Sequence, residues 1–384
     1  MKKCIRAARA LTMAPDENSI IEDFGLIHDG NRILETGTWS ALKDDFSGEV
    51  PLEVEDLGDV TIVPGLINAH VHLELSHLKG KTVQGQGFTN WIKSLLSNPL
   101  YDLDTEAVRN AVKQMRAEGT GFCVDISTRN CAQVAGIMDE LGMGFYACCE
   151  AIGVQTPKEK AKFFPQKRFQ YGRAAGSGHS LYSTGAELLQ AVKKANDAAG
   201  LPFPIHLAEN EEEDEIVAHG SGEFAGMLKG AGLLADCGNK GLRPVEYADS
   251  LGLLDESTLA VHCVRVADND ISTLRDRKVN VCLCPRSNSY IGEGRAPWEK
   301  ILKSGINTCL GTDSIASNYD LSMWNELEYL LKNTEISMSP AEALALVTSN
   351  SAQALKIDDS YGSLEKGKRA VYTAVPAHLE DLLF

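Results

Sequence analysis

Two histidines one residue apart stand at the end of an apolar run early in the chain. The run Ile62–Ala69 is followed by His70 and His72. Because side chains alternate between the two faces of a strand, both imidazoles point the same way at its carboxyl end. Histidine is the commonest metal-binding side chain, so this pair could hold one ion. Barrel-lining or surface histidines are the alternative, and the rest of the sequence must decide.

Three later apolar runs also end in a polar side chain. His206 follows residues 203–205, His262 follows 259–261 and Asp313 follows 308–312. Glu209 comes three residues after His206, where a carboxylate just beyond a strand end can project over a metal without binding it. Neutral imidazoles with one carboxylate are typical ligands of a borderline divalent cation. Packing alone does not explain four such strand ends.

The elements that must position these residues alternate in type along the chain. Helix-length amphipathic segments separate eight apolar segments, which are predicted strands at Gly65–Ala69, Thr120–Ile126, Gly144–Ala151, Gly176–Ser180, Pro204–Ala208, Leu259–Cys263, Asn280–Cys284 and Thr308–Gly311. Eight βα units predict an α/β fold, the (β/α)8 TIM barrel. Active sites of this fold lie at the carboxyl ends of the strands, where these polar residues are expected to meet.

Both chain ends are predicted to form a second, smaller domain. The first sixty residues alternate short apolar runs with turns such as Asp29-Gly30-Asn31, which indicates a small β layer. A late apolar strand, Ala370–Val375, follows a helical region at Pro340–Leu355 and comes too late for the barrel. We therefore expect a small β-sandwich domain from residues 1–62 and 356–384, and a barrel from 63–355.

Composition limits the partners. A formal net charge of −16 disfavours nucleic acid as a partner and favours a small-molecule substrate. No apolar run has the length of a signal peptide or a membrane span, so a cytoplasmic protein without a membrane partner is expected. The ten cysteines are scattered through apolar segments and are predicted to be reduced. A homodimer is possible, since it is the commonest soluble oligomer.

The sequence resembles the amidohydrolase superfamily over nearly its whole length, in Pro64–His72, His206–Glu209, His262-Cys263 and Gly311–Asp313. The His-X-X-Glu after the fifth strand is similar to the aminohydrolase branch, which deaminates nucleosides and nucleobases. The resemblance implies one divalent metal ion per chain, zinc before iron or nickel. Its implied ligands are His70, His72, His206 and Asp313.

The fourth predicted strand has no lysine that could bridge two metals, which favours a mononuclear site. His179 takes the place of a substrate-contacting histidine of the family, and a structural histidine is the alternative. The segments Cys284–Gly292, Gly311–Asn318 and Gly220–Phe224 look like those of aminodeoxyfutalosine deaminases. Adenosine and S-adenosylhomocysteine deaminases share part of this pattern. Ala370-Val371 departs from the usual Ala-Asp near the last strand.

The implied reaction is hydrolytic deamination of a 6-aminopurine nucleoside, most similar to 6-aminodeoxyfutalosine in menaquinone biosynthesis. A divalent metal lowers the pKa of bound water from 15.7 towards roughly 7 and so provides hydroxide. Glu209 is the candidate proton donor to the ring and to the leaving ammonia. His262 would hold the attacking oxygen and stabilise its charge, and Asp313 would accept a hydrogen bond from it.

Four residues are candidates for substrate binding. Arg286 could anchor a carboxylate or ribose through its guanidinium, with a surface ion pair as the alternative. Glu74 could bind ribose hydroxyls and Trp91 could cover the ring, while ordinary packing or a solvated loop is the alternative for each. His179 is the candidate contact with the ring.

Other functions fit parts of the same pattern. Adenosine, S-adenosylhomocysteine or methylthioadenosine could be the deaminated nucleoside. A chlorohydrolase-type triazine hydrolase would use the same metal ligands, but expelling ammonia needs a proton donor more than expelling chloride does, so Glu209 with His262 favours deamination. A catalytically inactive metal-binding interaction protein is the alternative of another class, although such a protein would normally have lost Glu209 or a ligand.

Overall fold

The computed structural model describes residues 2–15, 20–45, 53–154, 169–237 and 241–384. Its larger part is a sheet of eight parallel strands in the order β13-β12-β11-β10-β9-β8-β7-β6. The strands are β6 (Leu66–Val71), β7 (Thr120–Ser127), β8 (Gly144–Ala151), β9 (Gly172–Gly178), β10 (Phe203–Leu207), β11 (Thr258–His262), β12 (Asn280–Leu283) and β13 (Thr308–Leu310). The predicted TIM-type barrel is confirmed.

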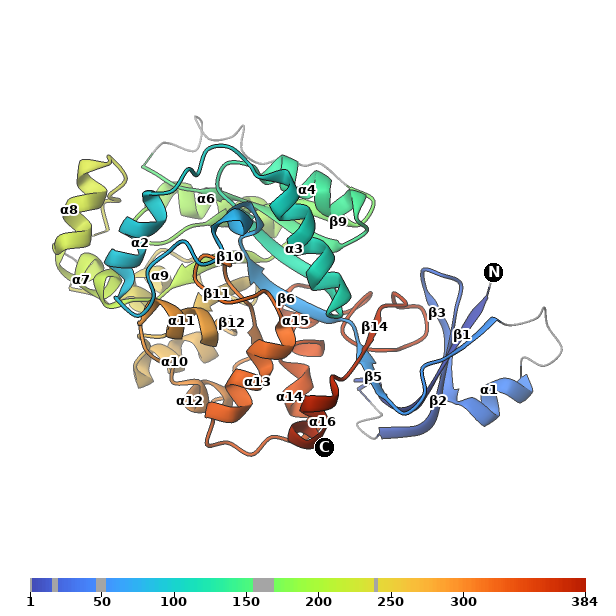
Figure 1. Cartoon of the computed structure of the whole chain (residues 1–384). Coiled ribbons are helices and arrows are strands. Elements are labelled where there is room, and N and C mark those ends of the chain that lie inside the picture. The colour runs from blue at the N-terminus through green and yellow to red at the C-terminus, as the bar shows by residue number, and fades with distance from the viewer. Residues whose placement is uncertain (1, 16–19, 46–52, 155–168, 238–240) are drawn as a thin grey trace.

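The barrel strands are buried on both faces, as expected when helices cover a parallel sheet. Every residue of β6, β10, β11, β12 and β13 is buried. The covering helices, which surround the strands in Figure 1, are α2 (Phe88–Leu96), α3 (Thr105–Ala117), α4 (Cys131–Glu140), α6 (Ala186–Ala199), α7 (Glu211–His219), α8 (Glu223–Gly230), α9 (Pro244–Ser250), α10 (Asp268–Asp276), α11 (Pro285–Ile291), α12 (Trp298–Lys303) and α13 (Met323–Asn333).

The first and last barrel strands meet without a regular ladder between them. At the carboxyl end, the backbone N–H of Asp313 donates to the carbonyl of His70 at 3.0 Å. Further down, Ile67 donates to the carbonyl of Val347 and Leu310 donates to the carbonyl of Leu346. This seam interrupts the helix predicted over Pro340–Leu355, and the chain forms two helices there, α14 (Pro340–Ala345) and α15 (Ser349–Ala354). The carbonyls between the two helices accept hydrogen bonds from the barrel strands.

A separate six-stranded sheet is built from both chain ends, as predicted. Its strands run in the order β14-β5-β1-β2-β3, with β4 paired to β1. They are β1 (Lys3–Leu11), β2 (Ile20–His28), β3 (Ile33–Thr38), β4 (Glu53–Asp56), β5 (Thr61–Pro64) and β14 (Tyr372–Ala374), with helix α1 (Trp39–Asp45) against β2 and β3. It lies beside the barrel in Figure 1. The boundaries at 62/63 and 355/356 stay a prediction, and β5 runs two residues past the first of them.

Small residues let the returning chain pack under the barrel. A Cβ on Gly65 or on Gly121 would lie 2.4 Å from Cγ1 of Val371, so both positions need glycine while valine is there. Gly65 comes just before β6 and Gly121 lies at the start of β7. Val371 of the Ala370-Val371 pair, which departs from the family pattern, thus fills the space beside the two glycines. After β14 the chain ends in helix α16 (Ala377–Leu383), which the sequence did not predict.

None of the helices in the described ranges is both long enough and apolar enough to cross a membrane.

Candidate metal centre and active site

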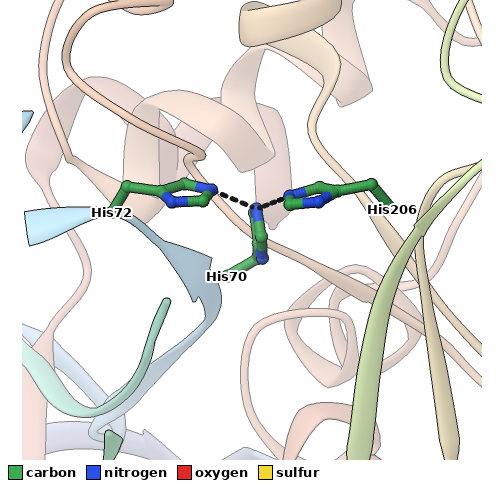
Figure 2. A group of neighbouring side chains, drawn as sticks. All are labelled: His70, His72 and His206. Atoms are coloured by element: carbon green, nitrogen blue, oxygen red, sulfur yellow. Dashed lines mark hydrogen bonds between the residues drawn. The ribbon is translucent and has the colours of Figure 1, made fainter. Parts of the chain in front are cut away.

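The polar strand ends converge as the sequence predicts. His70 lies in β6, His72 follows β6, His206 lies in β10 and Asp313 follows β13. His70 Nε2 is 3.1 Å from His72 Nε2 and 3.2 Å from His206 Nε2, and Figure 2 shows its ring pointing between the other two. Oδ1 of Asp313 lies 3.5 Å from His70 Nε2 and 3.4 Å from His72 Nε2.

The chemistry of this donor set fits a shared cation. A neutral imidazole nitrogen either donates one hydrogen bond or accepts one, so His70 Nε2 cannot satisfy His72 and His206 together. Ligands at 2.0–2.1 Å from a tetrahedral zinc ion would be roughly 3.3 Å apart, close to the separations here. The donor set of three imidazoles and one carboxylate therefore suits a zinc-like divalent ion.

Neighbouring groups orient two of these side chains. Nδ1 of His206 lies 2.9 Å from the carbonyl of His179, so Nδ1 carries the proton and Nε2 is free to bind a metal. Oδ2 of Asp313 accepts hydrogen bonds from the hydroxyls of Ser287 at 2.6 Å and Ser317 at 2.7 Å. The remaining oxygen, Oδ1, faces the histidines. Such outer contacts fix the direction of a ligand before any metal binds.

Backbone strain is concentrated at the same strand ends. His262 has a φ of 77° and Asp313 has a φ of 56°, in the left-handed region that non-glycine residues rarely adopt. Such a conformation costs about 1–3 kcal/mol per residue. Strain of this kind is kept where the surrounding structure forces a side chain into a functional direction, here towards the metal ligands.

Burial sets the protonation of the ligands. It lowers the pKa of His70 to about 4 and holds the pKa of His206 well below its usual value. Both imidazoles are therefore neutral at pH 7, the state in which they bind metals. Burial opposes ionisation of Asp313, but His70 and His72 outweigh it and hold the pKa of that carboxyl well below its usual value.

Glu209 and His262 form a second pair beside the metal ligands. Nε2 of His262 is 3.6 Å from Oε1 of Glu209, and Nδ1 of His262 is 3.0 Å from Oδ1 of Asn288. Because the amide oxygen accepts, Nδ1 carries the proton and Nε2 is an acceptor. Burial, together with the charges of Asp313 and Glu213, raises the pKa of Glu209 well above its usual value. Burial therefore favours the protonated form of Glu209.

A cavity of about 410 Å³ opens above these groups. Most of the predicted site residues line it: His72, Glu74, Trp91, His179, His206, Glu209, His262 and Asp313. Its apolar wall comes from two helices, with Phe88, Ile92 and Leu95 from α2 and Phe224, Met227 and Leu228 from α8. The rings of Phe88 and Phe224 meet edge to face at 5.4 Å and join the two helices. The cavity can therefore take a flat apolar ring above a polar floor.

Glu74 lines the cavity, but both of its carboxylate oxygens already have partners. Oε1 accepts the backbone N–H of Thr128 at 2.7 Å, and Oε2 accepts those of Arg129 and Asn130 at 3.2 and 3.1 Å. These bonds hold the loop between β7 and α4. The predicted contact of Glu74 with ribose stays a prediction, and loop support is the role visible in the structure.

The predicted role of Arg286 as a substrate anchor receives no support from its position. Its guanidinium forms a two-pronged pair with Asp320, at 2.7 and 2.9 Å, and Glu326 lies 3.7 Å away. Arg286 is not among the residues that line the cavity. The alternative of an ion pair fits better, although the pair is largely buried rather than on the surface because Arg286 is only 8% exposed.

Two charged residues of the cavity were not predicted. Glu150, at the end of β8, lines the cavity and is 5% exposed. It could have been found by the rule that found the others, since it is a carboxylate near the carboxyl end of a predicted strand. Arg129 lies on the loop after β7, exposed, with its guanidinium 4.9 Å from the centre of the Tyr101 ring. No spacing signal marks it.

The barrel and its strand-end site define a hydrolase that depends on a metal ion. Residues 61–383 match the Amidohydrolase family, and the chain belongs to that family. It is a hydrolase that acts on carbon–nitrogen bonds other than peptide bonds.

Known proteins that resemble the chain agree with this assignment. The 5-methylthioadenosine/S-adenosylhomocysteine deaminase of Moorella thermoacetica is 30% identical over 83% of this chain and 73% of its own. The aminofutalosine deaminase of Helicobacter pylori, solved with methylthio-coformycin, has a TM-score of 0.84 at 21% identity over 97% of this chain and 91% of its own. An adenosine deaminase of Xanthomonas campestris with bound zinc has a TM-score of 0.82 at 21% identity, over 99% and 88%. These two solved structures support the fold.

Proposed function

We propose that the protein is a metal-dependent deaminase that releases ammonia from a 6-aminopurine nucleoside. The observation that carries the proposal is the pair of Glu209 and His262 in one cavity beside a metal-type donor set: a buried carboxyl and, 3.6 Å away, an imidazole nitrogen that can accept a proton. Ammonia is a poor leaving group without a proton, and this pair can deliver one. The similarity to the Moorella deaminase supports the same class of reaction.

His70, His72, His206 and Asp313 would hold one divalent ion, and their spacing fits a tetrahedral zinc ion. The bound ion would supply a water molecule acidic enough to attack carbon at neutral pH. The zinc in the Xanthomonas structure supports this choice, with iron or nickel as alternatives that the same ligands accept.

The remaining groups move protons and orient the reactants. Glu209 donates its proton to the ring nitrogen beside the carbon that carries the amine, and then passes a proton from the attacking water to the departing ammonia. His262 accepts a hydrogen bond from the attacking water through Nε2. Because its Nδ1–H donates a hydrogen bond to Asn288, His262 can stabilise developing negative charge at Nε2 only after gaining a second proton. Oδ1 of Asp313 is the second acceptor for that water.

The substrate that we favour is 6-aminodeoxyfutalosine. The apolar wall suits a purine between Trp91 and the strand ends, and the cavity has room for a tail. The segments that resemble aminodeoxyfutalosine deaminases and the fold shared with the Helicobacter enzyme support this choice. Adenosine, S-adenosylhomocysteine and methylthioadenosine are the alternatives, and His179 would contact the ring of any of them.

Ammonia release tests the proposal. Purified protein of known metal content is given adenosine, S-adenosylhomocysteine, methylthioadenosine, aminodeoxyfutalosine, guanine and cytosine. We expect turnover of a nucleoside with about one metal per chain, and a loss of roughly 10²- to 10⁴-fold in Glu209→Gln, the range for a general acid–base group.

The matched control is Glu211→Gln, an exposed carboxylate on α7 that does not line the cavity. Its activity should equal that of the wild type. Metal-loaded protein that releases ammonia from none of these compounds would overturn the proposal, and release of chloride from a triazine would replace it.

A further inference from the structure

Glu150 is a buried carboxylate that the proposed chemistry does not use. It lies near the end of β8, it is 5% exposed, and it lines the cavity. Its Oε2 accepts a hydrogen bond from the hydroxyl of Thr128 at 2.7 Å. Its Oε1 has no hydrogen-bond donor among the residues that the structure describes. A buried acceptor without a donor is costly, so the position calls for one from a ligand.

The nearest imidazole, that of His206, does not satisfy this oxygen. Nδ1 of His206 lies 3.8 Å from Oε1 of Glu150, but its proton already goes to the carbonyl of His179 at 2.9 Å. No lysine or arginine in the described ranges forms an ion pair with Glu150. Glu74 differs, since its two oxygens accept three backbone N–H groups. Oε1 of Glu150 is therefore a buried acceptor in the cavity that is left for a donor from a ligand.

Strand order tells which part of a ligand would reach Glu150. The reacting amine must lie near His262 at the end of β11 and Asp313 after β13. β8 is three strands away from β11 in the closed order of eight, on the other side of the barrel mouth. The ligand group beside Glu150 thus lies on the far side of His206 from His262 and Asp313, and it must be a hydrogen-bond donor. In a nucleoside, the sugar hydroxyls are the donors remote from the amine.

We propose that Oε1 of Glu150 accepts a hydrogen bond from a sugar hydroxyl of the substrate and selects ribonucleosides over their deoxy analogues. This inference rests on the proposed function. Glu150 acts here as a specificity-determining residue, in the role that the sequence suggested for Glu74. The same carboxylate repels an anionic group placed at that hydroxyl.

The test removes the sugar hydroxyls of the substrate one at a time and compares the rates of ammonia release. Ammonia release is measured for adenosine and its 2′-, 3′- and 5′-deoxy analogues with wild type, Glu150→Gln, Glu150→Ala and the control Glu223→Gln, an exposed carboxylate on α8. In the wild type, loss of the contacted hydroxyl should lower kcat/KM about 10- to 100-fold, as for a hydrogen bond to a charged group. Glu150→Ala should lower kcat/KM for adenosine by a similar factor, and Glu150→Gln should have an intermediate kcat/KM. For the analogue that lacks the contacted hydroxyl, kcat/KM of Glu150→Ala should differ from that of the wild type by less than about threefold.

Metal content separates this role from an effect through His206. All four proteins should bind the same amount of metal, measured by elemental analysis. Three results would overturn the inference and leave the proposed deamination intact. The Glu150 variants could lose kcat/KM equally for adenosine and every analogue, they could lose metal, or the wild type could fail to distinguish the analogues. A wild type that deaminates no nucleoside would overturn the proposed function itself, and the inference with it.

Discussion

At the scale of single residues, neighbouring groups fix the direction of the side chains in the site. His206 has its proton fixed on Nδ1 by a carbonyl, and Asp313 has one oxygen held by two serine hydroxyls. Burial raises the pKa of Glu209 because it disfavours the charged form. The carbonyl that orients His206 is 27 residues away and the Ser287 hydroxyl is 26 residues from Asp313, so the residue types could be predicted from the sequence but these contacts could not.

Arg286 and Arg129 show where prediction from the sequence fails. Arg286 lies in the segment Cys284–Gly292, which resembles aminodeoxyfutalosine deaminases, but its partner Asp320 comes 34 residues later and no local pattern links them. Arg129 has no motif around it, and only the fold brings it to the cavity. It forms no ion pair with any described residue, so its charge is available to a ligand.

A substrate with an anionic tail tests Arg129. We expect Arg129→Gln to lower kcat/KM about 10- to 100-fold for a nucleoside whose tail carries a carboxylate, such as aminodeoxyfutalosine, because a charge-assisted hydrogen bond is lost. Adenosine, which has no such tail, should change less than about threefold. Steady-state ammonia release measures both.

Arg275→Gln on exposed α10 is the control for the loss of one positive charge. If Arg129→Gln lowers kcat/KM equally for adenosine and for the anionic substrate, Arg129 does not recognise the anionic tail.

At the scale of elements, strands were easier to predict than the connections that close the barrel. Each barrel strand is a short apolar run with clear ends, and its terminal polar residue follows the run directly. The break between α14 and α15 could not be predicted, because Leu346 and Val347 give their carbonyls to Leu310 and Ile67 rather than to a helix. Local helix propensity does not reveal such a competing partner.

The contact between the small domain and the barrel depends on two glycines. Gly121→Ala should reduce the free energy of unfolding by about 1–3 kcal/mol, because the new methyl group overlaps Cγ1 of Val371. In the double variant with Val371→Ala the nearest contact would be Cβ of residue 371 at 3.5 Å, an ordinary distance, so most of the loss should be recovered. Urea unfolding of both single variants and the double variant measures this. Additive losses would contradict the proposed overlap.

At the scale of the whole molecule, the proposed metal ion would connect the first, fifth and eighth strands of the barrel. His70 and His72 come from the first strand, His206 from the fifth and Asp313 from the end of the eighth. A ligand that binds only the folded state stabilises it by mass action, by about 4 kcal/mol at a thousand times its Kd.

Removal of metal should therefore lower thermal stability. We expect a chelator to reduce the Tm of the wild type by about 5–10 °C, since that binding energy spread over a large domain gives a shift of this size. Added zinc should restore the Tm. In His206→Ala the difference between chelated and zinc-loaded protein should shrink markedly. Differential scanning calorimetry would count against the proposed centre if wild-type Tm values with zinc and with chelator were equal.

The seam where Asp313 hydrogen-bonds to His70 also orders events during synthesis. A ribosome makes the first two histidines early and reaches Asp313 roughly 240 residues later, which takes about 10 to 50 s at ordinary elongation rates. Until then, the nascent chain has imidazoles but no carboxylate to complete the donor set. The proposed donor set would therefore be complete only once the last barrel strand has arrived, and a chain truncated before Asp313 would lack its carboxylate.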